Sequence, residues 1–225
     1  MSFIYPSDSL AMITVKTFEC NQLQENTYVV SDETRECVII DCGAYFEDEC
    51  QSISQYIDAQ QLKPVHLLAT HGHFDHNFGN DYIFRTYGLK VEISADDAYL
   101  INDLPGQFES MIGFPLRREY PEAGHFFNDG EQVRFGNHTF EILKTPGHTP
   151  GGVTFYNQEE SIAFSGDTLF RMSIGRTDFD RGSYQDIMAS LQNVIAKLPP
   201  DTVVFSGHGP KTTIGEELRY NPYFL

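Results

Sequence analysis

A short stretch of the chain is dense in side chains that bind metal ions. In THGHFDHNFGN, residues 70–80, three histidines and an aspartate fall between His71 and His76. Residues two apart in an extended segment point to the same side, so we expect His71, His73 and Asp75 to converge. His76 joins them only where the backbone turns. Because imidazole and carboxylate groups are ligands of zinc and iron, the stretch predicts a metal site.

Three further candidate ligands are set among glycines after expected strands. His148 lies in TPGHTPGG, Asp167 in FSGDTLF and His208 in FSGHGP. Glycine lets the backbone turn sharply, and loops at one end of a sheet commonly carry functional groups. The set then holds five histidines and two aspartates, which is more than a closed tetrahedral zinc site takes. Such a set suits two divalent ions that share a carboxylate.

The composition fits one soluble domain. The chain has 225 residues, of which 40% are hydrophobic, and no stretch approaches the roughly 20 apolar residues of a membrane span. Without an internal repeat or a linker, we expect a single domain over residues 1–225. The net charge of −17 argues against nucleic-acid and anionic membrane partners. The N-terminus does not resemble a secretory signal, which predicts a cytoplasmic protein.

Strands dominate both halves of the sequence, with helices between and after them. This order predicts two sheets packed face to face, with helices outside. Residues 104–129 carry few pattern signals, and we expect a long surface excursion there, a candidate lid. Periodicity and turn residues predict strands at 12–18, 26–31, 36–42, 64–70, 91–94 and the start of 202–210, an antiparallel meander at 131–167, and helices at 46–61, 80–88, 95–103, 183–197 and 215–221.

Taken in order, THGHFDH, TPGHTPGG, SGDTLF and SGHGP resemble the signature segments of the metallo-β-lactamase-fold superfamily. IIDCGA resembles the segment that supplies a supporting aspartate, here Asp41. The resemblance covers nearly the whole chain and implies an α+β fold, a four-layer αββα sandwich of two mixed β-sheets. Carried over position by position, it places His71, His73 and His148 on one metal, Asp75, His76 and His208 on the second, and Asp167 between them as a bridge.

Within that superfamily, the closer likeness is to glyoxalase II and its short bacterial relatives. SIGRTDF (173–179) and KTTIGEELRYNPYF (211–224) resemble their downstream segments. True β-lactamases lack the bridging aspartate, so Asp167 argues against antibiotic hydrolysis. Glyoxalase II carries a C-terminal helical domain that helps to hold glutathione, whereas only residues 209–225 follow the last ligand here. The resemblance implies a hydrolase of small thioesters and leaves the thiol open.

For such a hydrolase we expect two divalent metal ions, zinc first, with iron or manganese also compatible with the ligands. The expected nucleophile is a hydroxide that bridges the ions, oriented by Asp75, with Asp41 supporting a ligand histidine. Arg171 and Arg176 follow the bridging aspartate and are candidates to bind a substrate carboxylate. The alternative for Arg176 is a structural pair with a nearby aspartate, Asp178 or Asp180. The expected partner is a small-molecule thioester, and no oligomeric state is predicted.

Two other functions remain open. GRTDF also resembles a segment of the superfamily's persulfide dioxygenases, which bind a single iron and consume oxygen. The other is a metal-binding protein without catalysis. Cys42, where relatives often have proline, is expected either near the metals or in the core. Phe108, Met111 and Phe114 in 104–129 form either an apolar wall over the metals or ordinary loop packing.

Overall fold

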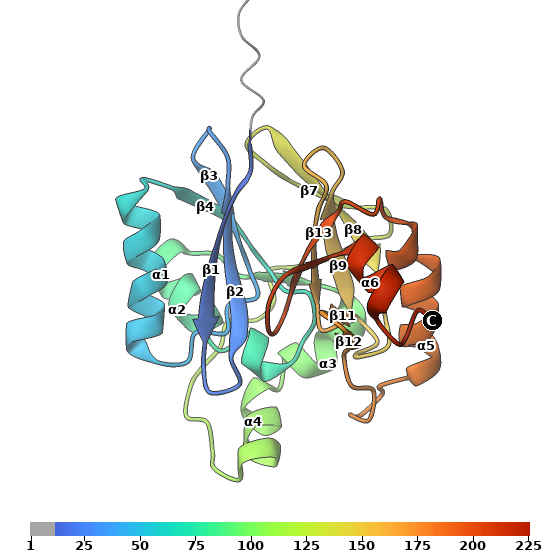
Figure 1. The fold of residues 1–225 in the computed structure, drawn as a ribbon. Helices are drawn as coiled ribbons and strands as arrows, with labels where there is room; N and C mark the ends of the chain where they lie inside the picture. Colours follow the sequence, from blue (N-terminus) through green and yellow to red (C-terminus); the bar gives the residue numbers. More distant parts are fainter. Residues whose placement is uncertain (1–11) are drawn as a thin grey trace, which may run out of the picture.

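The computed structural model describes residues 12–225 and shows two β-sheets packed face to face (Figure 1). The prediction about a secretory signal falls on residues that lie mostly outside this range. The first sheet has the strand order β1-β2-β3-β4-β5-β6 and the second β14-β13-β10-β9-β8-β7. The strands of the first sheet are β1 (Thr14–Cys20), β2 (Glu25–Ser31), β3 (Glu36–Ile40), β4 (Lys63–Leu68), β5 (Val91–Ile93) and β6 (His125–Phe126).

Both sheets mix parallel and antiparallel pairs. In the first, the pairs β3–β4, β4–β5 and β5–β6 are parallel, while β2 pairs antiparallel with both β1 and β3. In the second, β10 pairs with β13 in parallel and the other pairs are antiparallel, as the meander predicted. Its strands are β7 (Gln132–Phe135), β8 (His138–Lys144), β9 (Val153–Asn157), β10 (Ile162–Gly166), β13 (Val203–Ser206) and β14 (Thr212–Thr213); β11 (Leu169–Phe170) and β12 (Ser173–Ile174) pair separately.

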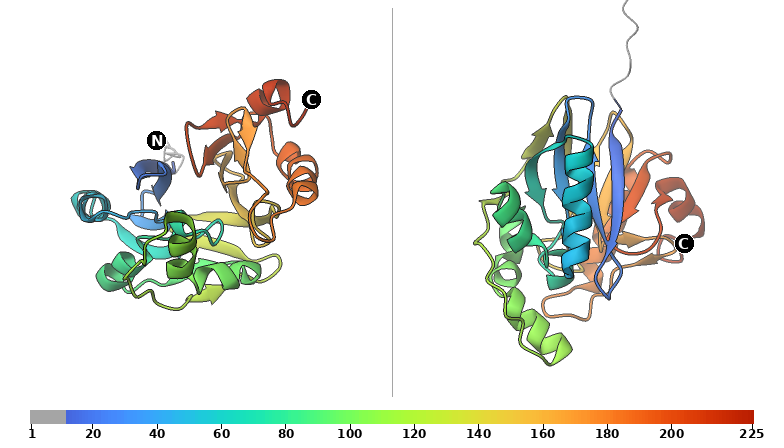
Figure 2. Two further views of the ribbon diagram at one scale, coloured as in Figure 1. Left: turned by 90° about the horizontal axis from the view of Figure 1, so that it is seen from below. Right: turned by 90° about the vertical axis from the view of Figure 1, so that its left-hand side faces the viewer.

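Helices cover the outer face of each sheet, so the predicted four-layer αββα sandwich is confirmed (Figure 2). Phe140, Phe155 and Phe164 are buried between the sheets. Ile53 packs in the core beneath α1 and Ile187 in the core beneath α5. The helices are α1 (Glu47–Ala59), α2 (Asn80–Tyr87), α3 (Ala98–Ile101), α4 (Leu104–Ile112), α5 (Tyr184–Asn193) and α6 (Ile214–Tyr220), with short 3₁₀ helices η1 (Phe74–His76), η2 (Ala95–Asp97) and η3 (Ile195–Lys197).

The prediction of a loop over 104–129 is wrong for its first part, because Leu104–Ile112 form α4. Asp103 caps this helix by accepting a hydrogen bond from the backbone N–H of Gly106 at 3.1 Å. Pro105 lies in the first turn, where a helix needs no N–H from it. The helix ends at Gly113, whose φ of 81° is left-handed. Proline and glycine therefore mark the start of a helix here and not a break.

Within residues 12–225, no helix combines the length and the apolar character needed to cross a bilayer.

Candidate metal centre

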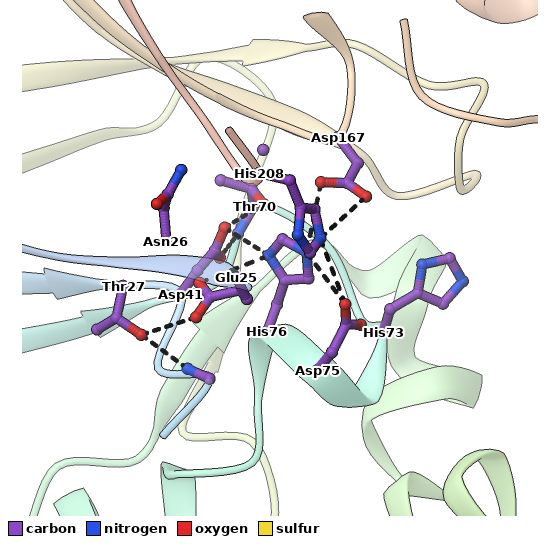
Figure 3. Close-up of polar contacts among 12 residues, drawn as sticks. Glu25, Asn26, Thr27, Asp41, Thr70, His73, Asp75, His76, Asp167 and His208 are labelled. Atoms are coloured by element: carbon purple, nitrogen blue, oxygen red, sulfur yellow. Dashed lines mark hydrogen bonds and ion pairs between the residues drawn. The ribbon is translucent and has the colours of Figure 1, made fainter. Parts of the chain in front are cut away.

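The predicted ligands meet where strand ends of the two sheets face one another. Parallel strands end at the same edge of a sheet, and the segments after β3 and β4 carry Asp41 and the 70–80 stretch. In the second sheet, Asp167 follows β10 and His208 follows β13, which are also parallel neighbours. His148 comes from the connection between β8 and β9. Figure 3 shows Asp75, His76, Asp167 and His208 pointing toward one another.

His71, His73 and His148 form one group whose ligand atoms lie within 4.8 Å of one another. The Nδ1 atom of His73 is 2.9 Å from the Nε2 atom of His148. The Nε2 atom of His71 is buried and has no hydrogen-bond partner among the described residues. Burial and the neighbouring histidines lower the pKa of His71 well below its usual value and the pKa of His73 to about 3. These two rings are therefore neutral at pH 7, which is the form that binds a cation.

Asp75, His76 and His208 form a second group within the same 4.8 Å limit. The turn η1 redirects the backbone, so that His76 joins the centre as the sequence required. The Nε2 atom of His208 lies 3.4 Å from Oδ2 of Asp75, and that of His76 lies 3.8 Å from the same oxygen. Burial opposes charge on both rings, but the carboxylates raise the pKa of His76 and of His208 above the usual value. The negative potential that favours a proton here also favours a divalent cation.

Asp167 lies between the two groups. Its Oδ1 is 3.4 Å from Nε2 of His76, and its Oδ2 is 3.4 Å from Nε2 of His148 and 3.8 Å from Nε2 of His208. Burial alone would raise its pKa, yet His76 and the other histidines hold the pKa well below its usual value. An ionised carboxylate within reach of both nitrogen groups has the geometry of a bridge.

Backbone carbonyls fix the orientation of two of the rings. The Nδ1–H of His148 donates to the carbonyl oxygen of Arg176 at 2.7 Å. The Nδ1–H of His208 donates to the carbonyl oxygen of Leu23 at 3.0 Å. Each bond occupies the outer nitrogen and leaves Nε2 directed at the centre, which is how ligand histidines are commonly held.

Asp41, the expected supporting aspartate, is hydrogen-bonded to two residues of the 70–80 stretch. Its carboxylate accepts hydrogen bonds from the backbone N–H and the hydroxyl of Thr70, both at 2.7 Å, and from Nδ1 of His76 at 3.1 Å. It is 1% exposed, and its φ of 52° places it in the left-handed region. Asp41 therefore connects the end of β3 to the ligand loop after β4.

Sequence reasoning missed Asp97, which joins two of the ligand loops. Its fully buried carboxylate accepts hydrogen bonds from the N–H of Gly72 at 2.9 Å, the hydroxyl of Thr149 at 2.7 Å and the N–H of Gly151 at 2.7 Å. Gly72 stands between His71 and His73, and Thr149 follows His148. No local signal distinguishes Asp97 from its exposed neighbour Asp96.

A second missed carboxylate, Glu25, lies behind His76. It is fully buried, and one oxygen accepts a hydrogen bond from the hydroxyl of Thr27 at 2.8 Å. The other oxygen lies 3.9 Å from Nδ1 of His76 and has no hydrogen-bond partner in the described part of the chain. Burial raises the pKa of Glu25 well above its usual value. Gly43 is required beside it, because a Cβ there would come within 2.1 Å of the carboxylate.

The two arginines that the sequence offers for binding a substrate carboxylate, Arg171 and Arg176, lie in different surroundings. A cavity of about 600 Å³ opens on the centre, and Arg176 lies on its lining. The guanidinium of Arg176 binds the carboxylate of Asp178 with two hydrogen bonds of 2.7 Å, as the alternative reading proposed. Arg171 is exposed and lies outside this lining.

Of the two positions expected for Cys42, the structure shows the second. Cys42 is buried in the core beside Gly79, and burial raises the pKa of its thiol.

The donors at the centre fit two divalent cations. Buried nitrogen and oxygen atoms without partners, on His71 and Asp167, point to a missing positive charge. The mixture of imidazole and carboxylate donors suits zinc, iron or manganese. The remaining three histidines are paired with carboxylates away from this centre: Glu92 for His66, Glu131 for His125 and Asp32 for His138.

Comparison with known proteins gives the same fold. Residues 20–208 match the Metallo-beta-lactamase superfamily. The chain is 34% identical over 212 residues to the hydroxyacylglutathione hydrolase GloC of Haemophilus influenzae, covering 94% of this chain and 98% of that protein.

Solved structures extend the comparison. The BLEG-1 B3 metallo-beta-lactamase superposes with a TM-score of 0.86 at 36% identity, covering 94% of this chain and 99% of that one. TTHA1623 in a di-iron-bound form gives a TM-score of 0.80 at 34% identity, with coverages of 93% and 100%. ETHE1 from Myxococcus xanthus gives 0.75 at 27% identity, with coverages of 93% and 83%.

Proposed function

The chain belongs to the metallo-β-lactamase superfamily, and on that basis we propose that it is a binuclear metal-dependent hydrolase of small thioesters. The observation that carries the proposal is the position of Asp167 between two groups of three ligands. Similarity to GloC over nearly all of both chains supports thioesters as the substrate class. We assign His71, His73 and His148 to one ion, Asp75, His76 and His208 to the other, and Asp167 to both, within a single domain over residues 1–225.

Two bound divalent cations would lower the pKa of a water molecule to near neutrality and polarise the thioester carbonyl. The chain itself orients the reactants. Asp75 lines the cavity, and although burial raises its pKa, His76 and His208 bring that pKa below its usual value. Its carboxylate is therefore ionised at neutral pH and can accept a hydrogen bond from the attacking water.

Two serines, Ser110 and Ser173, line the cavity, and neither is activated by a histidine. The hydroxyl of Ser173 donates to a backbone carbonyl at 3.5 Å. All four cysteines are buried, and burial raises the pKa of each thiol. Among the described residues, no hydrogen bond joins a serine or cysteine of the cavity lining to a histidine. These features support attack by water over a covalent acyl-enzyme.

The test is hydrolysis of thioesters by the zinc-loaded and iron-loaded protein, followed through the released thiol. S-D-lactoylglutathione and acyl thioesters of other thiols are the substrates, and a chromogenic cephalosporin tests β-lactam hydrolysis, as the likeness to BLEG-1 requires. We expect thiol release that Asp167→Asn abolishes. β-Lactam hydrolysis without thioesterase activity would contradict the proposal.

A persulfide dioxygenase is the second candidate, because GRTDF at 175–179 resembles a segment of those enzymes. His73, His148 and Asp167 would then hold a single iron. Oxygen uptake by the iron-loaded protein with a persulfide, without thioester hydrolysis, would establish this function in place of the first.

A further inference from the structure

A second cavity, of about 320 Å³, adjoins the one that opens on the metal centre. The two share Leu23 and Phe74 on their linings. Phe74 stands in the chain between the candidate ligands His73 and Asp75, and all three residues line the larger cavity. We call this second cavity the apolar arm.

Aromatic rings form the floor of the apolar arm. The ring centroid of Phe78 lies 5.2 Å from that of Phe74 and 5.7 Å from that of Phe108. Tyr45 packs edge-on against Phe78 at 4.8 Å. Phe74 and Phe78 are buried, and both belong to or follow the turn that carries Asp75. The floor is therefore a rigid continuation of the ligand loop.

Exposed apolar side chains form the rim. Helix α4 projects from the end of the molecule near the β1–β2 turn (Figures 1 and 2). At its end, Ile112 is 45% and Phe114 71% exposed, and both line the apolar arm. Leu23 on the β1–β2 turn is 44% exposed, and its carbonyl accepts the hydrogen bond from His208. Large apolar side chains gathered at a cavity are typical of a binding surface.

The charged side chains on the two cavity linings favour an uncharged substrate over one that carries several negative charges. No charged side chain of the described residues lines the apolar arm. In the adjoining cavity, the one cation of the described lining is Arg176, which is paired with Asp178, while Asp180 adds a negative charge. A thioester that carries several carboxylates or phosphates therefore finds no free positive side chain on either lining within residues 12–225. The polar side chains of the apolar arm, Asn21 and Gln22, are uncharged, and an uncharged chain gains there by leaving water.

We propose that the apolar arm binds the acyl chain of the substrate, so that the enzyme prefers medium-length, uncharged acyl thioesters to S-lactoylglutathione. This inference rests on the proposed thioester hydrolysis. The reacting carbonyl lies at the metal centre, and the acyl chain extends past Phe74 toward Ile112 and Phe114. The thiol portion occupies the larger cavity.

Acetyl, butanoyl, hexanoyl and octanoyl thioesters of N-acetylcysteamine, a small neutral thiol, test the proposal. We expect kcat/KM to rise along the series, by up to about fourfold for each methylene that leaves water. Phe114→Ser should lower the octanoyl-to-acetyl ratio of kcat/KM by about tenfold. Phe84→Ser is the matched control, because Phe84 is 38% exposed on α2 and lies outside both cavities. A flat series, an unchanged ratio in Phe114→Ser, or a preference for S-lactoylglutathione would overturn the proposal.

Binding of a ketone analogue, in which a methylene replaces the thioester sulfur of the octanoyl compound, separates this inference from the hydrolase. Calorimetry should show about tenfold weaker binding to Phe114→Ser than to Phe84→Ser. If no thioester is hydrolysed but this difference appears, binding of the acyl chain in the apolar arm is supported and the proposed hydrolysis is contradicted. If thioesters are hydrolysed but the ketone binds both variants equally, the proposed hydrolysis is supported and binding of the acyl chain in the apolar arm is contradicted.

Discussion

The Nδ1 atom of His73 lies 2.9 Å from the Nε2 atom of His148, although the two residues are 75 positions apart in the sequence. Two neutral imidazoles this close repel through their lone pairs unless a proton or a cation lies between them. The fold therefore holds His73 and His148 in an arrangement that is satisfied either by a hydrogen bond from His73 to His148 or by a cation that both bind.

Removal of the metal should consequently destabilise the protein. A cation present at 100 times its dissociation constant adds about 2.7 kcal/mol to the free energy of unfolding. For a chain of this size, we expect chelation to lower the midpoint of thermal unfolding by about 5–10 °C. Calorimetry before and after chelation, and after zinc is returned, measures the effect. An unchanged midpoint would show that the apposed histidines do not depend on a cation.

Asp167→Asn tests the proposed bridge. The amide keeps the size of the side chain but removes the charge between the two ligand groups. We expect the bound metal to fall from two ions toward one, and kcat/KM for thioesters to fall by more than about 100-fold. Asp58→Asn, on the exposed face of α1, is the control and should retain both. Full metal content in Asp167→Asn would contradict a bridging role.

Asp97→Ala tests the connection between the ligand loops. The truncation leaves three buried donors, on Gly72, Thr149 and Gly151, without an acceptor. We expect the free energy of unfolding to fall by about 3 kcal/mol or more. Urea denaturation in the presence of a chelator measures this loss without a contribution from metal binding. Asp97→Asn, which keeps an acceptor oxygen, should lose less; equal losses would contradict the account.

These residues also show how far the sequence could be interpreted. The seven candidate ligands were found because each stands in a local pattern of histidine or aspartate with glycine, and the structure brings all seven together. Asp97 and Glu25 could not be found, because their roles arise from contacts with distant loops. Most helices followed from the periodicity of one buried face, and the fully buried strands β2, β9 and β10 followed from short runs rich in β-branched and aromatic residues between turn residues. Helix α4 did not, because its capping by Asp103 outweighs the presence of Pro105 and Gly106.

His66 gives a prediction about pH that does not involve the metal centre. The hydrogen bond from its Nδ1 to Glu92, 2.6 Å long, raises the pKa of His66 above its usual value of 6.5. A raised pKa means that the bond stabilises the fold fully below about pH 6.5 and that this stabilisation is lost as the pH rises through the folded-state pKa. Since both side chains are partly exposed, the contribution is about 1 kcal/mol.

The measurement is the difference in unfolding free energy between the native chain and His66→Gln. We expect this difference to be larger at pH 6 than at pH 9. Because the ligand histidines are present in both proteins, their titration cancels in the comparison. A difference that grows with pH would have the wrong sign for the proposed ion pair.

Metal stoichiometry tests the central claim most directly. The protein is purified without chelator, and plasma mass spectrometry gives the identity and number of the metal ions bound to each chain. The binuclear hydrolase predicts about two divalent ions per chain, zinc, iron or a mixture of the two. About one iron per chain, and little other metal, would contradict that account and favour the dioxygenase.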